Sequence, residues 1–138
     1  HIALSVSNLE RSIEFYKFVG HFKLIRLVDN KLGEKLGEVV GLPNTSARIA
    51  HLSDGVTMFE LFEFNYPKPK QIEGENYFAG LGFIHLGIAT TDIFYDWERL
   101  VEKNVKFITK PIEFRQGVWM CYFYGPDGEI CELRQTSE

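Results

Sequence analysis

The sequence predicts an α+β fold built from two pseudo-symmetric halves, each with the order strand, helix and three strands (βαβββ). Two observations predict it. Residues 1–9 align with residues 85–93 when the chain is shifted by 84 residues, and both segments read as a short strand followed by a helix start. Residues 58–61 align with residues 130–133 at a shift of 72 residues. Two copies of so long a unit indicate a duplicated fold and not a solenoid.

Each predicted helix begins at a polar residue that can cap it. In the first half, Ser7 and Glu10 have the S-x-x-E spacing of a capping box. In the second half, Asp92 or Thr91 can accept a hydrogen bond from the first turn. Apolar residues then recur at helical spacing in both segments: Leu9, Ile13 and Tyr16 in the first, and Ile93, Trp97 and Leu100 in the second.

The two shifts differ, so the first half carries about a dozen extra residues. We expect them between residues 29 and 46, where residues 33–40 can form a short helix. Residues 65–82, which contain prolines and glycines, are typical of a connector. The predicted organisation is one domain over residues 1–138, made of module 1 (1–64), the connector (65–82) and module 2 (83–138).

Length and composition exclude several classes of protein. A chain of 138 residues can bury one ordinary core. The net charge is -4 and no basic stripe is visible, which argues against a nucleic-acid partner. The longest uncharged stretch, residues 76–91, is too broken by glycines for a membrane span, and no signal peptide is visible. The two cysteines, Cys121 and Cys131, are expected to pack in the core of a cytoplasmic protein.

Two histidines and two glutamates occupy matching positions in the two halves. His1 and His85 open one pair of aligned segments, and Glu60 and Glu132 lie in the other pair. An acid such as Glu132, inside the apolar run 129–133, is costly to bury unless a charged group compensates it. Equivalent strands of two pseudo-symmetric halves can bring such residues to one point. The sequence therefore predicts a divalent metal site between the halves, with ligands that suit Zn, Ni, Co, Mn or Fe(II).

Strand alternation separates the side chains near the first glutamate. Glu63 is expected on the face opposite Glu60, so only one of these two acids can face the metal. Phe62 shares the parity of Glu60 and can line an apolar cleft, as can Tyr122 near Glu132.

The last hairpin has a predicted register. A three-residue turn with Gly128 in a left-handed bulge pairs Tyr122 with Glu132 on one face. Arg115 is a candidate contact for an anionic substrate, although a solvated loop position is the simpler expectation. His21 and His51 have no matched partners, so surface or structural roles are expected for them.

These residues resemble the vicinal oxygen chelate superfamily, also called the glyoxalase, bleomycin-resistance and dioxygenase superfamily. The resemblance covers nearly the whole chain. It implies paired βαβββ modules that form a cupped mixed sheet around a divalent metal, with His1, Glu60, His85 and Glu132 as ligands. It also implies a small-molecule substrate and a possible homodimer. The motifs that carry it are His1 before 7–16, the run 59–61, His85 before Asp92, and Gly125-Pro126-Asp127-Gly128 before Glu132.

The activity that the resemblance implies first is that of a metal-dependent lyase or isomerase of the glyoxalase type. Such an enzyme moves a proton next to a metal-chelated carbonyl, with Zn, Ni, Co or Mn as the ion. Glu132 is the expected base and Glu60 is the second candidate by pseudo-symmetry. Tyr122, beside Glu132, is the third catalytic candidate. Residues 61–67 match poorly to the glutathione-contacting segment of glyoxalase I, which argues against glutathione as co-substrate.

Two alternatives stay open. An extradiol ring-cleaving dioxygenase would hold Fe(II) with His1, His85 and Glu132, and would place a tyrosine at position 122. Residues 66–84 contain no acid-base histidine for it, and Glu60 would occupy a coordination position that catechol and dioxygen need. A metal-free protein that binds a drug or metabolite would usually lack these ligands, whereas this chain has all four.

Overall fold

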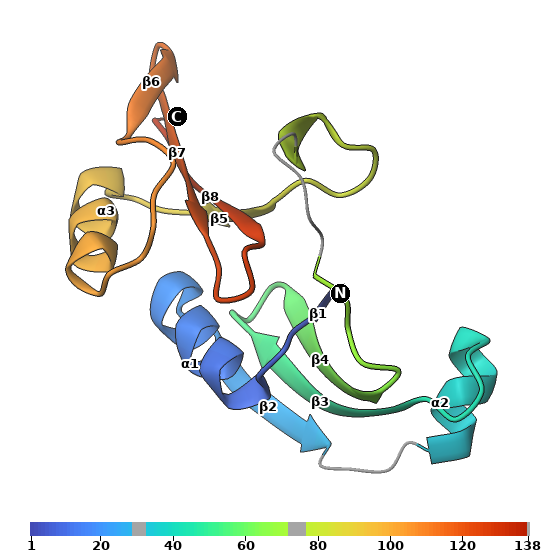
Figure 1. Cartoon of the computed structure of the whole chain (residues 1–138). Helices are drawn as coiled ribbons and strands as arrows, with labels where there is room; N and C mark the ends of the chain where they lie inside the picture. Colours follow the sequence, from blue (N-terminus) through green and yellow to red (C-terminus); the bar gives the residue numbers. More distant parts are fainter. Residues whose placement is uncertain (29–32, 72–76, 138) are drawn as a thin grey trace. The chain divides into compact units, whose positions relative to one another are not determined.

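A computed structural model describes residues 1–28, 33–71 and 77–137 (Figure 1). The chain divides into two compact units, His1–Gln71 and Ile72–Glu138, which we call the first and second unit. Their boundary falls inside the predicted connector, 65–82. Among the described helices, none is long and apolar enough to cross a membrane.

The first unit is a four-stranded mixed sheet with α1 packed against β3 and β4 (Figure 1). The strand order is β1-β4-β3-β2; β1 runs parallel to β4, and the other neighbours are antiparallel. The predicted extra helix is present as α2, which contacts β3. The elements are β1 (Ile2–Ser5), α1 (Leu9–Gly20), β2 (Lys23–Val28), α2 (Gly33–Val40), β3 (Ser46–Ser53) and β4 (Met58–Tyr66).

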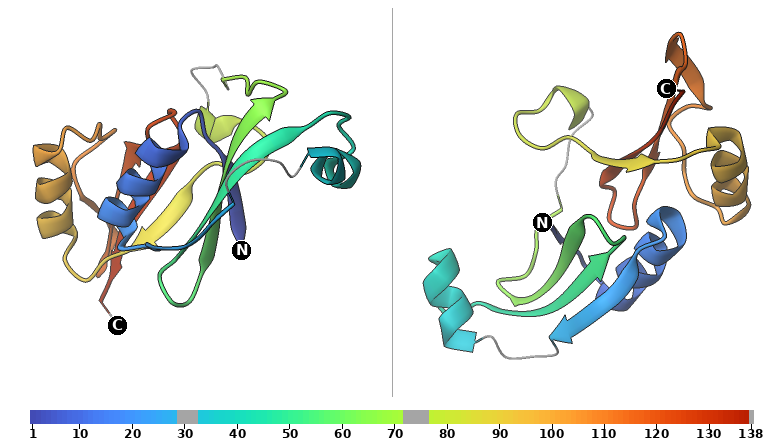
Figure 2. Two further views of the ribbon diagram at one scale, coloured as in Figure 1. Left: turned by 90° about the horizontal axis from the view of Figure 1, so that it is seen from below. Right: turned by 180° about the vertical axis from the view of Figure 1, so that it is seen from behind.

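The second unit repeats this topology strand by strand. Figure 2 shows the ribbon of this unit, in yellow to red, from two further sides. Its strand order is β5-β8-β7-β6, with β5 parallel to β8 and the remaining pairs antiparallel. The predicted fold class, α+β with two βαβββ modules, is therefore confirmed. The elements are η1 (Tyr77–Ala79), β5 (Leu86–Ala89), α3 (Ile93–Glu102), β6 (Ile112–Arg115), β7 (Val118–Tyr124) and β8 (Ile130–Thr136).

The core of each unit lies between its helix and one face of its sheet. In the first unit, the helical stripe of α1 is buried, and Tyr16 packs edge-to-face on Phe59 of β4 with ring centroids 4.7 Å apart. In the second unit, Ile93 and Leu100 of α3 are fully buried, as is Leu133 of β8. Each such side chain contributes roughly 1.5–3 kcal/mol when removed from water. Alternate residues of β4 and β8 therefore point to the helix, and the residues between them point to the other face.

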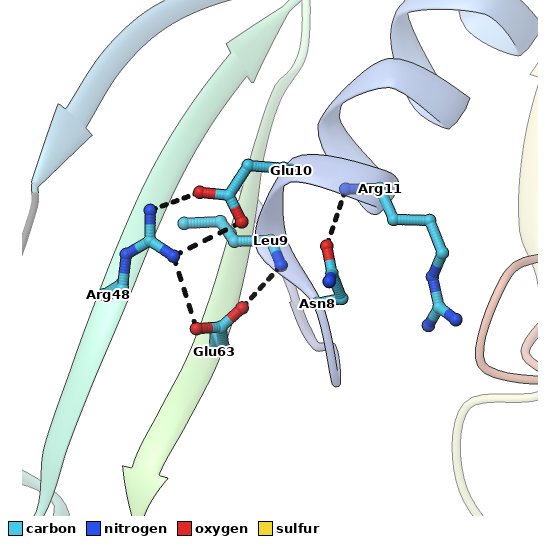
Figure 3. A network of polar contacts seen from close by, with 6 residues as sticks. All are labelled: Asn8, Leu9, Glu10, Arg11, Arg48 and Glu63. Atoms are coloured by element: carbon cyan, nitrogen blue, oxygen red, sulfur yellow. Dashed lines mark hydrogen bonds and ion pairs between the residues drawn. The ribbon is translucent and has the colours of Figure 1, made fainter.

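The first helix begins one residue later than the capping-box prediction. Asn8, not Ser7, is the N-cap, and its side-chain oxygen accepts a hydrogen bond from the Arg11 backbone N–H at 2.9 Å. Glu10 cannot complete a capping box because its carboxylate pairs with Arg48 of β3 (Figure 3). In the second unit the prediction is confirmed, since Asp92 caps α3.

In each unit, a side chain of the last strand accepts a hydrogen bond from the first residue of the helix. Glu63 Oε2 accepts a hydrogen bond from the Leu9 backbone N–H at 2.6 Å (Figure 3). Gln135 Oε1 accepts one from the Ile93 N–H at 2.8 Å. Both N–H groups belong to a first helical turn, where helices leave donors unsatisfied. Positions 63 and 135 are related by the 72-residue shift, and Glu63 lies on the helix face as strand alternation predicts.

Replacing Glu63 by alanine is expected to destabilise the protein by about 1–2 kcal/mol. The change leaves the Leu9 N–H without its acceptor and removes one carboxylate, 3.4 Å away, from Arg48. The measurement is chemical denaturation followed by circular dichroism. Glu14→Ala is the matched control, because Glu14 forms only an exposed ion pair with Lys17 and should cost well under 1 kcal/mol. Equal losses in the two variants would contradict the anchoring role of Glu63.

Candidate functional site

The two predicted metal-binding glutamates lie on the sheet face that turns away from the helix. Each lies in an inner strand between two neighbours: β4 pairs with β1 and β3, and β8 pairs with β5 and β7. Glu60 is opposite Ala3 on one side and opposite His51 on the other. Glu132 is opposite Gly87 and Tyr122. The two glutamates therefore occupy the same place in their units, which is what the repeat predicts.

Glu60 lies between two histidines of the first unit. Its Oε2 is 3.4 Å from His1 Nε2, and its Oε1 is 3.0 Å from His51 Nε2. His1 was predicted to approach Glu60, and it does. The sequence predicts a surface or structural role for His51 and gives no sign of its contact with Glu60. The hairpin register between β3 and β4 places residues 51 and 60 directly opposite, so this register is the signal that could have found it.

Glu132 is buried, with 5% of its surface exposed. Its Oε2 is 3.2 Å from His85 Nε2, as the sequence predicts. Its carboxylate also accepts a hydrogen bond from the Tyr122 hydroxyl. Burial, and next this hydrogen bond to Glu132, raise the pKa of Tyr122 to about 12. The Tyr122 hydroxyl is thus protonated at neutral pH and can only stabilise Glu132 as a donor.

The donor atoms of each pair fit a divalent metal. Two ligands that are each about 2.1 Å from one ion, at angles of about 90–110°, are about 3.0–3.4 Å apart. The nitrogen and oxygen of the His1–Glu60 and His85–Glu132 pairs are 3.4 and 3.2 Å apart. Within either unit, the described residues include no group of three or more His, Cys, Asp or Glu that could hold an ion. Each unit therefore provides a ligand pair, and the four-ligand site stays a prediction.

A cavity of about 710 Å³ opens on the Glu132 face of the second unit. His85, Tyr122 and Glu132 line its polar part, and Phe114 and Met120 form an apolar wall. This volume is in the range of small-molecule sites. The prediction that Tyr122 lines a cleft is thus confirmed.

Farther along β8, the cavity is lined by Arg134 and Thr136. Arg115, the cation considered from the sequence, is exposed and is not among the lining residues. Phe62, the other predicted lining residue, stacks on Phe64 in the first unit with ring centroids 5.8 Å apart.

Both cysteines are free and buried, which confirms the prediction that they pack in the core. Burial, together with the charge of Glu132, raises the pKa of Cys121 to about 12. A thiol with such a pKa is neutral at physiological pH and is a poor nucleophile. Both cysteines lie on the helix side of the sheet, opposite the face of Glu132, so the candidate chemistry rests on the histidines, the glutamates and Tyr122.

Comparisons with known proteins agree with this fold. A family model described as "Glyoxalase/Bleomycin resistance protein/Dioxygenase superfamily" matches residues 1–133. A protein of Synechocystis sp. named "Probable lactoylglutathione lyase" is 28% identical over 138 residues, which are 99% of this chain and 94% of the relative. The crystal structure of a glyoxalase family protein from Bacillus cereus superposes with a TM-score of 0.86 at 23% identity, covering 99% of this chain and 92% of that one. Glyoxalase I from Zea mays gives a TM-score of 0.72 at 26% identity, over 99% of this chain and 43% of the maize chain.

We expect that neither Cys121 nor Cys131 reacts with a thiol reagent such as DTNB in the native protein at pH 8. Both side chains are buried, and the Cys121 thiol is protonated at that pH. After unfolding in guanidinium chloride, two thiols per chain should react. Rapid modification of one thiol in the folded protein would show that this core position is accessible.

Proposed function

The chain belongs to the glyoxalase/bleomycin resistance protein/dioxygenase superfamily, and we propose that it is a metal-dependent lyase or isomerase that transfers a proton next to a carbonyl group. The observation that carries the proposal is the buried Glu132, which contacts His85 and the Tyr122 hydroxyl beside a cavity of ligand size. Family membership alone does not fix a reaction. Members of the family act on small molecules, and a homodimer and a cytoplasmic location stay predictions for this chain.

His85 with Glu132, and His1 with Glu60, are the residues that we assign to metal binding. Their imidazole and carboxylate donors suit Zn, Ni, Co or Mn. When bound, such an ion supplies Lewis-acid polarisation of a substrate carbonyl, which makes the neighbouring C–H group more acidic. The protein contributes the orientation of these ligands through contacts that the side chains already make with their strand neighbours.

Glu132 is the general base in this proposal. Its carboxylate takes a proton from the hydroxyl-bearing carbon next to the substrate carbonyl and returns it to the former carbonyl carbon, while the hydroxyl proton passes to the former carbonyl oxygen. The hydroxyl of Tyr122 donates a hydrogen bond to Glu132 and so restricts the orientation of the carboxylate. Phe114 and Met120 line the same cavity and exclude part of the water from it. Positioned bases of this kind typically contribute 10²–10⁴-fold to a rate.

Glu60 is better suited to hold a metal than to move a proton. Both of its oxygens have an imidazole partner, Oε1 with His51 and Oε2 with His1. Glu132 has one imidazole partner, and its other contact is a hydroxyl. This difference supports the assignment of Glu132 as the base, with Glu60 as the second candidate.

The substrate named for the Synechocystis relative is lactoylglutathione. At 28% identity this activity is one candidate for the chain, and residues 61–67 argue against glutathione recognition. We therefore propose to test lactoylglutathione beside α-hydroxyketones that contain no glutathione. Deuterium exchange from D₂O next to the carbonyl, followed by NMR, detects the proton transfer for either class.

The wild-type chain, purified without chelator, is expected to retain a divalent metal that Glu132→Ala and Glu60→Ala lose. Each variant removes the oxygen donor of one pair, so the affinity should fall at least 10-fold. Elemental analysis and metal titration measure this, and the number of ions per chain shows whether one or two are held. Glu102→Ala is the control, because Glu102 is an exposed residue of α3.

No metal in the wild type after reconstitution would contradict the assignment and favour a metal-free binding protein. Full metal retention in Glu60→Ala, together with Fe(II) and oxygen uptake on catechols, would favour the dioxygenase.

Replacing Glu132 by glutamine should lower the rate of deuterium exchange by roughly 10²–10⁴-fold. The amide keeps the shape of the side chain and cannot accept the proton. Tyr122→Phe should lower the rate less, since it removes only the hydrogen bond to Glu132. Metal content is measured on the same samples, so that loss of the ion is separated from loss of the base. A larger effect of Glu60→Gln than of Glu132→Gln would reverse the assigned roles.

A further inference from the structure

A cation lies on the cavity face of an inner strand in the second unit. Arg134 follows Glu132 by two residues on β8, so the two side chains share a face. Its strand neighbours are Ala89 of β5 and Met120 of β7, neither of which carries a charge. Across the described residues, no carboxylate forms an ion pair with Arg134. A lone cation in a ligand-sized cavity is available to an anionic ligand.

The first unit shows that the scaffold does not need this cation. The 72-residue shift that relates Glu60 to Glu132 also relates Phe62 to Arg134. The equivalent inner strand of the first unit therefore forms with an aromatic side chain at that position, where Phe62 stacks on Phe64. Because the fold is the same in both units, a structural requirement does not account for the guanidinium in the second unit.

We propose that Arg134 binds the carboxylate of an acidic substrate whose reacting carbonyl lies at Glu132. This inference rests on the proposed function of the same cavity and extends it to a substrate class. The Cα atoms of residues two apart on a strand are about 7 Å apart, which favours a short spacing between the acid group and the reacting centre. The substrate is therefore a keto or hydroxyketo acid with a short chain between its two ends, and that chain lies along Phe114 and Met120.

The single positive charge of Arg134 matches the one negative charge of a carboxylate better than that of a phosphate monoester, which is close to two at neutral pH. One guanidinium matches one carboxylate through two parallel hydrogen bonds. Thr136 lines the same part of the cavity and carries a hydroxyl group. Among the residues that line the cavity, Arg134 is the one arginine or lysine, and His85 is assigned to the metal.

Gly87 keeps the cavity open beside the base. It lies opposite Glu132 on β5, and a Cβ built at this position has no atom within 4 Å. A larger side chain there would therefore project into open space and not into the protein. This makes residue 87 a position where the cavity can be filled without disturbing the core.

The test measures how the metal-loaded, full-length chain binds 6-hydroxy-5-oxohexanoate and its uncharged amide. Isothermal titration gives both dissociation constants. The wild type should bind the carboxylate about 10- to 100-fold more tightly than the amide, as expected for a hydrogen bond to a charged group. Arg134→Gln should remove this preference by weakening only the carboxylate, and Arg134→Lys should restore part of it. Arg115→Gln, which removes an exposed cation that does not line the cavity, should change neither constant.

A cavity-filling variant tests where the ligand binds. Gly87→Leu should weaken both probes at least 10-fold while the chain still unfolds cooperatively. Unchanged binding of both probes in Gly87→Leu would overturn the placement in this cavity.

Equal affinity of the wild type for carboxylate and amide, or binding of neither, would overturn the role of Arg134. A preference of more than 10-fold for the corresponding phosphonate over the carboxylate would also overturn it. Metal content is measured separately. A chain without metal that still prefers the carboxylate, and loses this preference in Arg134→Gln, would refute the proposed function and support the Arg134 subsite.

Discussion

The parallel pairing of the first and last strands in each unit is the constraint on which the candidate site depends. Parallel neighbours need a crossover connection, and here the crossover includes the helix that covers one face of the sheet. Glu63 and Gln135 fix this arrangement by accepting hydrogen bonds from the first helical turn. Because strand side chains alternate, the glutamate three positions before each of them must face away from the helix. The parallel register then brings a histidine near the start of the first strand within 3.4 Å of that glutamate.

The two units keep this geometry and differ in the chemistry around it. The residue opposite the glutamate is His51 in the first unit and Tyr122 in the second. An imidazole can bind either a proton or a metal, whereas a tyrosine with a pKa of about 12 is a hydrogen-bond donor at neutral pH. The two units therefore place two carboxylates at equivalent positions, and the residues on the neighbouring strands give these carboxylates different surroundings. Both glutamates are assigned to metal binding, and the difference between their strand neighbours is the physical basis for assigning proton transfer to Glu132.

The sequence was sufficient for those features that follow from period and register. The repeat predicts that His1, Glu60, His85 and Glu132 form one site; the structure brings His1 to Glu60 and His85 to Glu132. The turn at Gly128 predicts that Tyr122 faces Glu132, as the structure has it. The repeat could not find His51, because the residue in its place in the second unit is a tyrosine and the two types do not match. The S-x-x-E spacing misplaced the cap of α1, since Glu10 pairs with Arg48, which is 38 residues away along the chain. Long-range contacts of this kind depend on the packed sheet and leave no local pattern.

The charge balance of the cavity links the base to the substrate. Two carboxylates about 7 Å apart repel each other by up to about 2 kcal/mol at an effective dielectric constant of about 20. The positive charge of Arg134, two residues from Glu132 on β8, offsets this repulsion by attracting the substrate acid. In the first unit, Glu60 has no proposed acidic ligand beside it, and the equivalent position is Phe62. The equivalent position thus carries a cation in the second unit and an aromatic ring in the first. This difference is what we expect if only the second unit binds the anionic end of the substrate.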